Sequence, residues 1–119
     1  MKILIIEDEI LIQQSLKKLL TRLGEEVETA ASGSEGLKKI AENNFDQIIC
    51  DLMLQDITGF DVIEAAKNIY GENVIKNKFI IMTAYSSEQV LSKAQDYGCK
   101  ILNKPFSNLD EALKIMRGK

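Results

Sequence analysis

Five short apolar runs, separated by longer segments with the period of a helix, constrain this chain more than any other feature. Three runs are almost continuously apolar, which is typical of parallel strands covered by helices on both faces. The run at 26–30 alternates instead, with Val27 and Thr29 set between glutamates, so we expect it at an edge of the sheet. The runs cover residues 3–6, 26–30, 47–51, 79–83 and 100–102.

The intervening segments predict five helices. The first covers about residues 9–23, and Gly24 ends it. The second, fourth and fifth are expected to begin at hydroxyl caps, namely Ser34, Ser86 and Ser107, and the third is expected to begin near Thr58. Leu109 is expected on the buried face of the last helix.

Strict alternation of strands and helices predicts an α/β fold with a parallel sheet and right-handed crossovers. For five strands we expect the flavodoxin-like order 2-1-3-4-5 with helices on both faces. The 119 residues are enough for one domain, residues 1–119, but not for two. Ligands of such folds bind at the carboxyl ends of the strands, near the switch point between strands 1 and 3.

Composition excludes several classes of function. The chain has no histidine, which rules out serine–histidine and cysteine–histidine catalytic pairs, two-histidine zinc sites and a phosphohistidine of its own. Its net charge of −3 favours neither nucleic acid nor an anionic membrane. Cys50 and Cys99 lie in apolar runs without metal spacing and indicate buried thiols in a reducing compartment. The apolar run at 3–6 is too short for a signal peptide, so we expect a cytoplasmic protein without a membrane span.

Polar side chains end the predicted strands. Glu7 and Asp8 follow the first, Asp51 ends the third, Thr83 ends the fourth and Lys104 follows the fifth. In the order 2-1-3-4-5 these ends converge. Clustered carboxylates without histidine or thiolate are ligands that Mg²⁺ prefers, and a hydroxyl and an ammonium suit phosphate oxygens. These are the parts of a phosphoryl-transfer site with a carboxylate nucleophile.

Each of these residues also has a structural interpretation. Glu7 and Asp8 can be acidic residues that are stabilised by the positive N-terminal end of the next helix. Thr83 can be a β-former and Lys104 a surface lysine. Asp51 is harder to explain in this way, since a carboxylate that ends so apolar a strand needs a partner or solvent.

With these residues at its strand ends, the whole chain resembles the receiver domain of bacterial two-component response regulators. The order and spacing of five motifs carry the resemblance. They are Ile5-Ile6-Glu7-Asp8-Glu9, Cys50-Asp51-Leu52-Met53, Thr58-Gly59-Phe60-Asp61, Met82-Thr83-Ala84 and Asn103-Lys104-Pro105-Phe106.

The resemblance implies a role for each residue at the strand ends. It makes Asp51 the phosphoacceptor, Thr83 the hydroxyl that moves to the phosphoryl group and Lys104 the ammonium that pairs with that group. It further implies a cis bond between Lys104 and Pro105, a state that is essentially restricted to X–Pro bonds.

The implied cofactor is Mg²⁺. Asp8 and Asp51 would bind it directly, Glu7 through water, and Met53 through its main-chain carbonyl.

Three departures from the family pattern stand out. Gln55 replaces a frequent proline, which predicts a less rigid loop, and Ile101 replaces the usual switch aromatic, for which Tyr85 offers an alternative reporter. Met53 and Tyr85 occupy the two variable positions that flank the phosphoryl group. Neither is acidic, so neither can accept a proton from an attacking water, and we expect slow self-dephosphorylation.

The resemblance also implies partners. A histidine kinase or phosphotransfer protein would supply the phosphoryl group, docking near Leu11 and Ile12, whose side chains we otherwise expect in the core. The last two helices and the fifth strand would form the output face toward a downstream domain or protein, and a homodimer through that face stays open. We expect no direct contact with nucleic acid or membrane. The chain is expected to be a receiver cut from a longer protein, although a stand-alone regulator stays open.

Two other functions are compatible with this fold. An aspartyl-phosphate hydrolase needs a second carboxylate two residues after the nucleophile, where this chain has Met53. A phosphorylation-independent interaction module on the same fold is the alternative, and the intact set of site residues counts against it.

Overall fold

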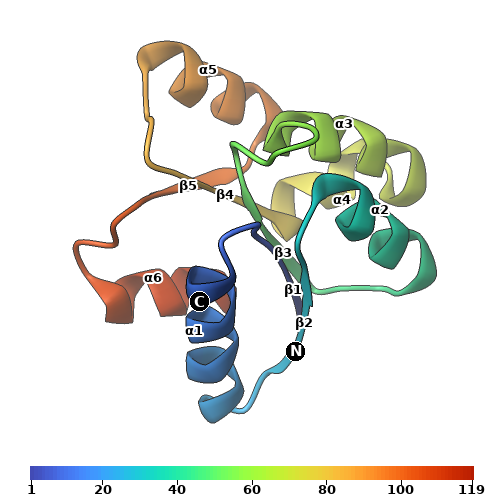
Figure 1. Cartoon of the computed structure of the whole chain (residues 1–119). Helices are drawn as coiled ribbons and strands as arrows, with labels where there is room; N and C mark the ends of the chain where they lie inside the picture. The colour runs from blue at the N-terminus through green and yellow to red at the C-terminus, as the bar shows by residue number, and fades with distance from the viewer.

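The five predicted strands pair in one parallel sheet in the computed structural model of the chain (Figure 1). The structure describes the backbone of residues 1–119 and every side chain except those of Val74, Lys76 and Asn77. The strands are β1 (Lys2–Ile6), β2 (Glu26–Ala30), β3 (Gln47–Asp51), β4 (Phe79–Thr83) and β5 (Lys100–Asn103). Their order, β2-β1-β3-β4-β5, confirms the predicted topology and places β2 at an edge.

The register of the sheet brings the carboxyl ends of the central strands to the same level. Ile6 pairs with Cys50, Asp51 with Met82, and Thr83 with Asn103. The residues that end or follow β1, β3, β4 and β5 therefore lie side by side along one edge of the sheet.

The helices divide between the two faces of the sheet. They are α1 (Ile10–Arg22), α2 (Gly33–Glu42), α3 (Gly59–Tyr70), α4 (Glu72–Lys78), α5 (Glu88–Tyr97) and α6 (Leu109–Met116). One buried cluster joins Ile3 and Ile5 to Leu20 of α1 and Met116 of α6, and the other face packs against α2 to α5 (Figure 1). Successive strand residues point to opposite faces, so an almost continuously apolar strand can fill both cores.

Helix α4 is absent from the sequence-based prediction. Gly71 has φ of 87°, a left-handed conformation that ends α3, and the short helix follows directly. Ile75 is buried in the same cluster as α2 and α3. A segment of this length with so few apolar residues has no readable helical period.

The three expected caps were each wrong by one or two residues. Helix α3 begins near Thr58 as expected, and Thr58 caps it in a capping box with Asp61. The other caps are Ser32 for α2, Ser87 for α5 and Asn108 for α6, in place of Ser34, Ser86 and Ser107. Each correct cap lies beside or near the expected one, and either side chain satisfies the same sequence rule.

Two expectations about burial also need correction. Leu109 is 41% exposed because it is the first residue of α6. Cys50 is buried but Cys99 only partly, and both thiols are free. Among the helices that the structure describes, none is long and apolar enough to cross a membrane.

Candidate functional site

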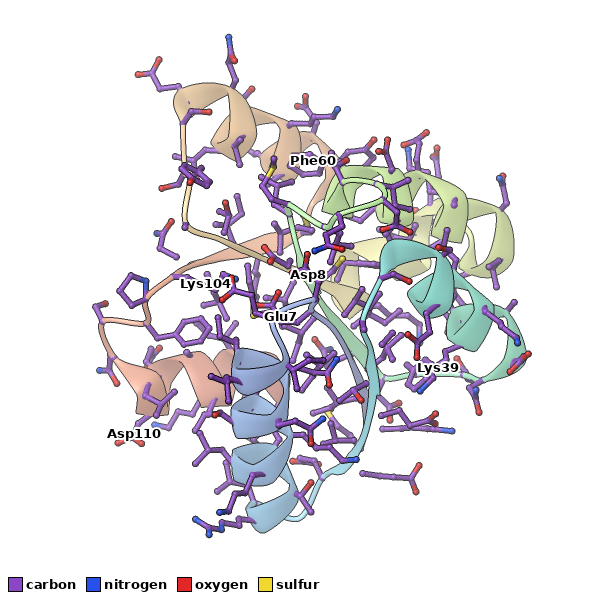
Figure 2. The ribbon with its side chains drawn as sticks, in the orientation of Figure 1. Glu7, Asp8, Lys39, Phe60, Lys104 and Asp110 are labelled. Carbon is purple, nitrogen blue, oxygen red and sulfur yellow. The ribbon has the colours of Figure 1, made fainter. Side chains whose placement is uncertain are left out.

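The sequence-predicted site residues meet at the carboxyl edge of the sheet. Figure 2 shows Glu7, Asp8 and Lys104 lying together near the centre of the view, where the strands end above α1. Asp51, at the end of β3, joins this group through Lys104. The structure thus brings together residues that directly follow β1 and β5 and the last residue of β3, across up to 97 positions of sequence.

Lys104 connects two of the carboxylates. Its Nζ donates to Oε1 of Glu7 at 2.8 Å and to Oδ2 of Asp51 at 3.2 Å. Burial alone lowers the pKa of this ammonium, but its hydrogen bond to Glu7 and the charge of Asp51 outweigh burial and leave the pKa above its ordinary value. Lys104 therefore stays cationic in the folded protein.

The backbone at Lys104 is set by its neighbours. Its N–H donates to the carbonyl of Thr83 at 2.8 Å, which continues the β4–β5 pairing beyond the strand. The bond from Lys104 to Pro105 is cis, as the resemblance implied.

Glu7 is the most buried member of the site. Its side chain has no exposed surface, and Oε2 has no hydrogen-bond partner among the side chains that the structure describes. Burial, reinforced by the adjacent Asp51 carboxylate, raises the pKa of Glu7 to about 8. A buried carboxylate oxygen without a partner is costly unless a proton, a water or a cation satisfies it.

The acidic cluster has the chemistry of a divalent-cation site. One carboxylate oxygen each from Glu7, Asp8 and Asp51 lies within 4.8 Å of the others. Asp8 is half-buried, so the cluster opens to solvent on its side. An all-oxygen donor set with an unpartnered buried oxygen fits a hard cation such as Mg²⁺, which keeps several of its waters.

Thr83 lies at the end of β4 and is almost fully buried. Its hydroxyl donates to the carbonyl of Tyr85 at 3.2 Å and accepts from the N–H of Tyr85 at 2.9 Å. The hydroxyl therefore holds the start of the β4–α5 loop. The Tyr85 side chain itself is 72% exposed.

Met53 belongs to the loop that follows Asp51. Its N–H donates to Oδ1 of Asp51 at 3.4 Å, and an isolated bridge pairs it with Thr58 across the loop. Gly59 closes the loop at the start of α3, where a Cβ would lie 2.9 Å from the carbonyl oxygen of Asp51. Only glycine allows the backbone to approach Asp51 so closely.

Gln13 supports the site and was missed in the sequence. Its Nε2 donates to the carbonyls of Glu7 at 3.0 Å and Ala30 at 3.2 Å, so that α1 ties together the ends of β1 and β2. The sequence does contain a sign of this role. Gln13 lies three residues before Leu16 on the buried stripe of its helix, where a polar side chain needs hydrogen-bond partners.

Comparisons with known proteins agree with this geometry. The family described as Response regulator receiver domain matches residues 3–117. The transcriptional regulatory protein CrdR of Helicobacter pylori is 30% identical over 111 residues, which make up 92% of this chain and 50% of CrdR. The chain thus spans about half the length of that relative.

Solved structures give the same result. The chemotaxis protein CheY4 of Vibrio cholerae is 32% identical with a TM-score of 0.86, and the match covers 98% of this chain and 95% of that one. The response regulator TrrA of Thermotoga maritima, solved in complex with Mg²⁺ and BeF, is 28% identical with a TM-score of 0.80 over 99% of this chain and 98% of that one. The chain belongs to the family of response regulator receiver domains.

Proposed function

We propose that this receiver domain accepts a phosphoryl group on Asp51 from the phosphohistidine of a partner kinase or phosphotransfer protein, in a reaction that depends on Mg²⁺. The observation that supports this best is the meeting of Asp51, Lys104 and the acidic pair at one edge of the sheet. The domain acts as a regulatory phosphoacceptor and catalyses only its own phosphorylation and dephosphorylation.

The chemistry follows from the groups present. A carboxylate oxygen of Asp51 attacks the phosphorus, and the phosphorus–nitrogen bond of the phosphohistidine breaks with its electron pair left on the imidazole. Lys104, already held on Asp51, pairs with an oxygen of the incoming group. A second hydrogen bond, to Glu7, helps to hold the ammonium of Lys104 in place.

The cation would be held by Glu7, Asp8, Asp51 and the main-chain carbonyl of Met53. When bound, Mg²⁺ offsets the negative charge that gathers as the phosphoryl group approaches the carboxylates. The unpartnered Oε2 of Glu7 and the Mg²⁺ in the TrrA structure both support this assignment.

The switch would run through Thr83. If its hydroxyl turns to the phosphoryl group on Asp51, both of its hydrogen bonds with the main chain of Tyr85 are lost. The β4–α5 loop is then released from β4, which biases α5, β5 and α6 toward a second packing. These elements, equivalent to the last two predicted helices and the fifth strand, would form the output face.

A surface beside the site fits the partner that supplies the phosphoryl group. A groove of about 370 Å³ runs between α1 and the β5–α6 loop, lined by Leu11, Ile12, Ser15, Leu16, Leu19, Lys104, Pro105, Phe106 and Leu109. Leu11 is 85% exposed at its rim, so it belongs to the surface, whereas Ile12 packs against the core. An apolar helix of a kinase or phosphotransfer protein would bury this rim and bring its phosphohistidine to Asp51.

Intact mass tests the proposal. The protein is incubated with acetyl phosphate and Mg²⁺, and we expect one added phosphoryl group that is stable in acid and lost in base. Asp51→Asn is the matched control and should stay unmodified. Failure of the wild-type protein to gain the group would favour the phosphorylation-independent module, and rapid release of free phosphate would favour the hydrolase.

A further inference from the structure

The loop from Leu52 to Thr58, between β3 and α3, is anchored at its tip by Asp56. Oδ1 of Asp56 accepts from the N–H of Gly33 at 2.9 Å. Oδ2 accepts from the N–H of Ser34 at 2.9 Å and from its hydroxyl at 2.6 Å. The tip of this loop is therefore bonded to the first turn of α2, more than twenty residues away in the sequence.

Apolar packing holds the same contact. A Cβ on Gly33 would lie 2.3 Å from Cγ1 of Ile57 and 2.6 Å from its Cδ1, so the Ile57 side chain rests directly on the glycine. Ile57 also packs against the buried cluster beneath α2 and α3. The loop tip and α2 thus meet without room for another atom.

The base of the loop is closed separately. Met53 and Thr58 form an antiparallel bridge, and the N–H of Gly59 donates to the carbonyl of Leu52 at 2.8 Å. With base and tip both tied, the main chain at Met53 cannot shift without breaking one of these contacts. The only proline of the chain is Pro105, so no ring stiffens the loop.

Asp56 remains ionised over the whole working range of pH. The hydrogen bond from the Ser34 hydroxyl, with those from the backbone N–H groups of Ser34 and Gly33, holds the pKa of Asp56 far below its usual range. The positive end of α2 favours the same charge. The carboxylate is therefore charged at neutral pH, which is the form that can accept all three hydrogen bonds.

We propose that Asp56 is a positioning residue for the cation site: by fastening the loop to α2 it keeps the main chain of Met53 facing Asp51. This inference rests on the proposed function, in which the Met53 carbonyl binds Mg²⁺. It assigns the affinity for Mg²⁺ in part to a side chain that touches neither the cation nor the phosphoryl group.

The test compares the affinity for Mg²⁺ with thermal stability in Asp56→Ala and in the control Ser32→Ala. Ser32 caps the same helix through the N–H of Glu35, and its removal weakens α2 without touching the loop. We expect Asp56→Ala to raise the dissociation constant for Mg²⁺ about 10-fold, the lower end of what loss of a supporting contact costs a metal site. Ser32→Ala should lower the melting temperature but leave that constant within about 2-fold of wild type.

Calorimetric titration with MgCl₂ gives the dissociation constant, and the Met53 amide resonance reports the local change. Asp56→Asn serves if the alanine variant does not fold, because its amide oxygen can still accept from Gly33 while its NH2 group can no longer accept from the N–H of Ser34. We expect it to show an intermediate affinity.

Two results would overturn the inference: an unchanged Mg²⁺ affinity in folded Asp56 variants, or an equal loss in Ser32→Ala. Both leave the proposed function standing, because the wild-type protein would still bind Mg²⁺ and accept the phosphoryl group. Absence of Mg²⁺ binding by the wild-type protein would instead refute the proposed function together with the inference.

Discussion

Replacing Glu7 with glutamine should remove a pH dependence from the stability of the metal-free protein. Glu7 is fully buried, Asp51 lies beside it, and its pKa is raised from the ordinary 4.5 to about 8. Glutamine keeps the size and one acceptor for Lys104 but carries no titratable group. The variant therefore resembles the wild-type protein with Glu7 protonated, at every pH.

The sign and size of the effect follow from proton linkage. Between pH 4.5 and pH 8 the folded protein holds a proton on Glu7 that the unfolded chain has released, so the free energy of unfolding falls as pH rises. A full difference of one proton is worth about 1.4 kcal/mol per pH unit. From pH 6 to pH 8 the wild-type protein should lose about 2 kcal/mol, because the proton is half released at pH 8.

The composition of the chain leaves few other groups that titrate between pH 6 and pH 8. Histidine is the side chain that ordinarily titrates between pH 5 and pH 8, and the chain has none. Urea unfolding in EDTA at pH 6, 7 and 8 measures the slope. Glu7→Gln should be nearly flat across this range, and Glu9→Gln, which alters an exposed neighbour, should keep the wild-type slope.

Added Mg²⁺ provides a second arm of the same experiment. At pH 8 a concentration ten times the dissociation constant should stabilise the wild-type protein by about 1.4 kcal/mol, since the ion binds only the folded state. Glu7→Gln should gain much less. Parallel stability curves for wild type and Glu7→Gln between pH 6 and pH 8 would refute the assignment of a raised pKa to Glu7.

Three further predictions concern the supports of the site, the core and the lifetime of the phosphoryl group. Gln13→Leu should lower the free energy of unfolding by about 1–3 kcal/mol, because the buried carbonyls of Glu7 and Ala30 lose the hydrogen bonds from its Nε2, whereas Lys18→Leu on the exposed side of α1 should change it by less than about 0.5 kcal/mol in the same urea titration. Ile63→Ala should cost about 2–5 kcal/mol as a cavity in the core between β3, β4 and α3, and a loss below 1 kcal/mol would contradict the packing described. Met53→Glu should speed loss of the phosphoryl group, followed by intact mass over time, because a carboxylate beside Asp51 can accept a proton from the attacking water; an unchanged rate would count against a role for this position.

The sheet and the convergence of the site residues could be predicted because both follow from patterns that are visible in short stretches of the sequence. A run such as Ile48, Ile49 and Cys50 is buried on both faces, which is typical of a parallel strand covered by helices on both sides. Once the strand order follows, Asp51 and Lys104 must converge at the carboxyl edge, whatever the details of the loops.

The features that were missed depend on choices between neighbours of similar chemistry. Ser32 and Ser34 both satisfy the rule for a cap, and the presence of Asp56 decides between them because it occupies the hydroxyl of Ser34. Gln13 and Thr83 both form hydrogen bonds with main-chain atoms at the ends of strands or in loops. Sequence carries no local sign of where such atoms will lie.

The separation of Lys104 from its partners has a consequence for how the domain assembles. Glu7 and Asp51 come together as soon as β1 and β3 pair. Lys104, whose ammonium group bonds to both carboxylates, joins them only when β5 pairs, and it lies 53 residues after Asp51. A partly folded chain without the β4–β5 pairing holds its acidic groups against one another with no lysine between them. If the proposed function is right, only molecules whose sheet is complete would be able to accept the phosphoryl group.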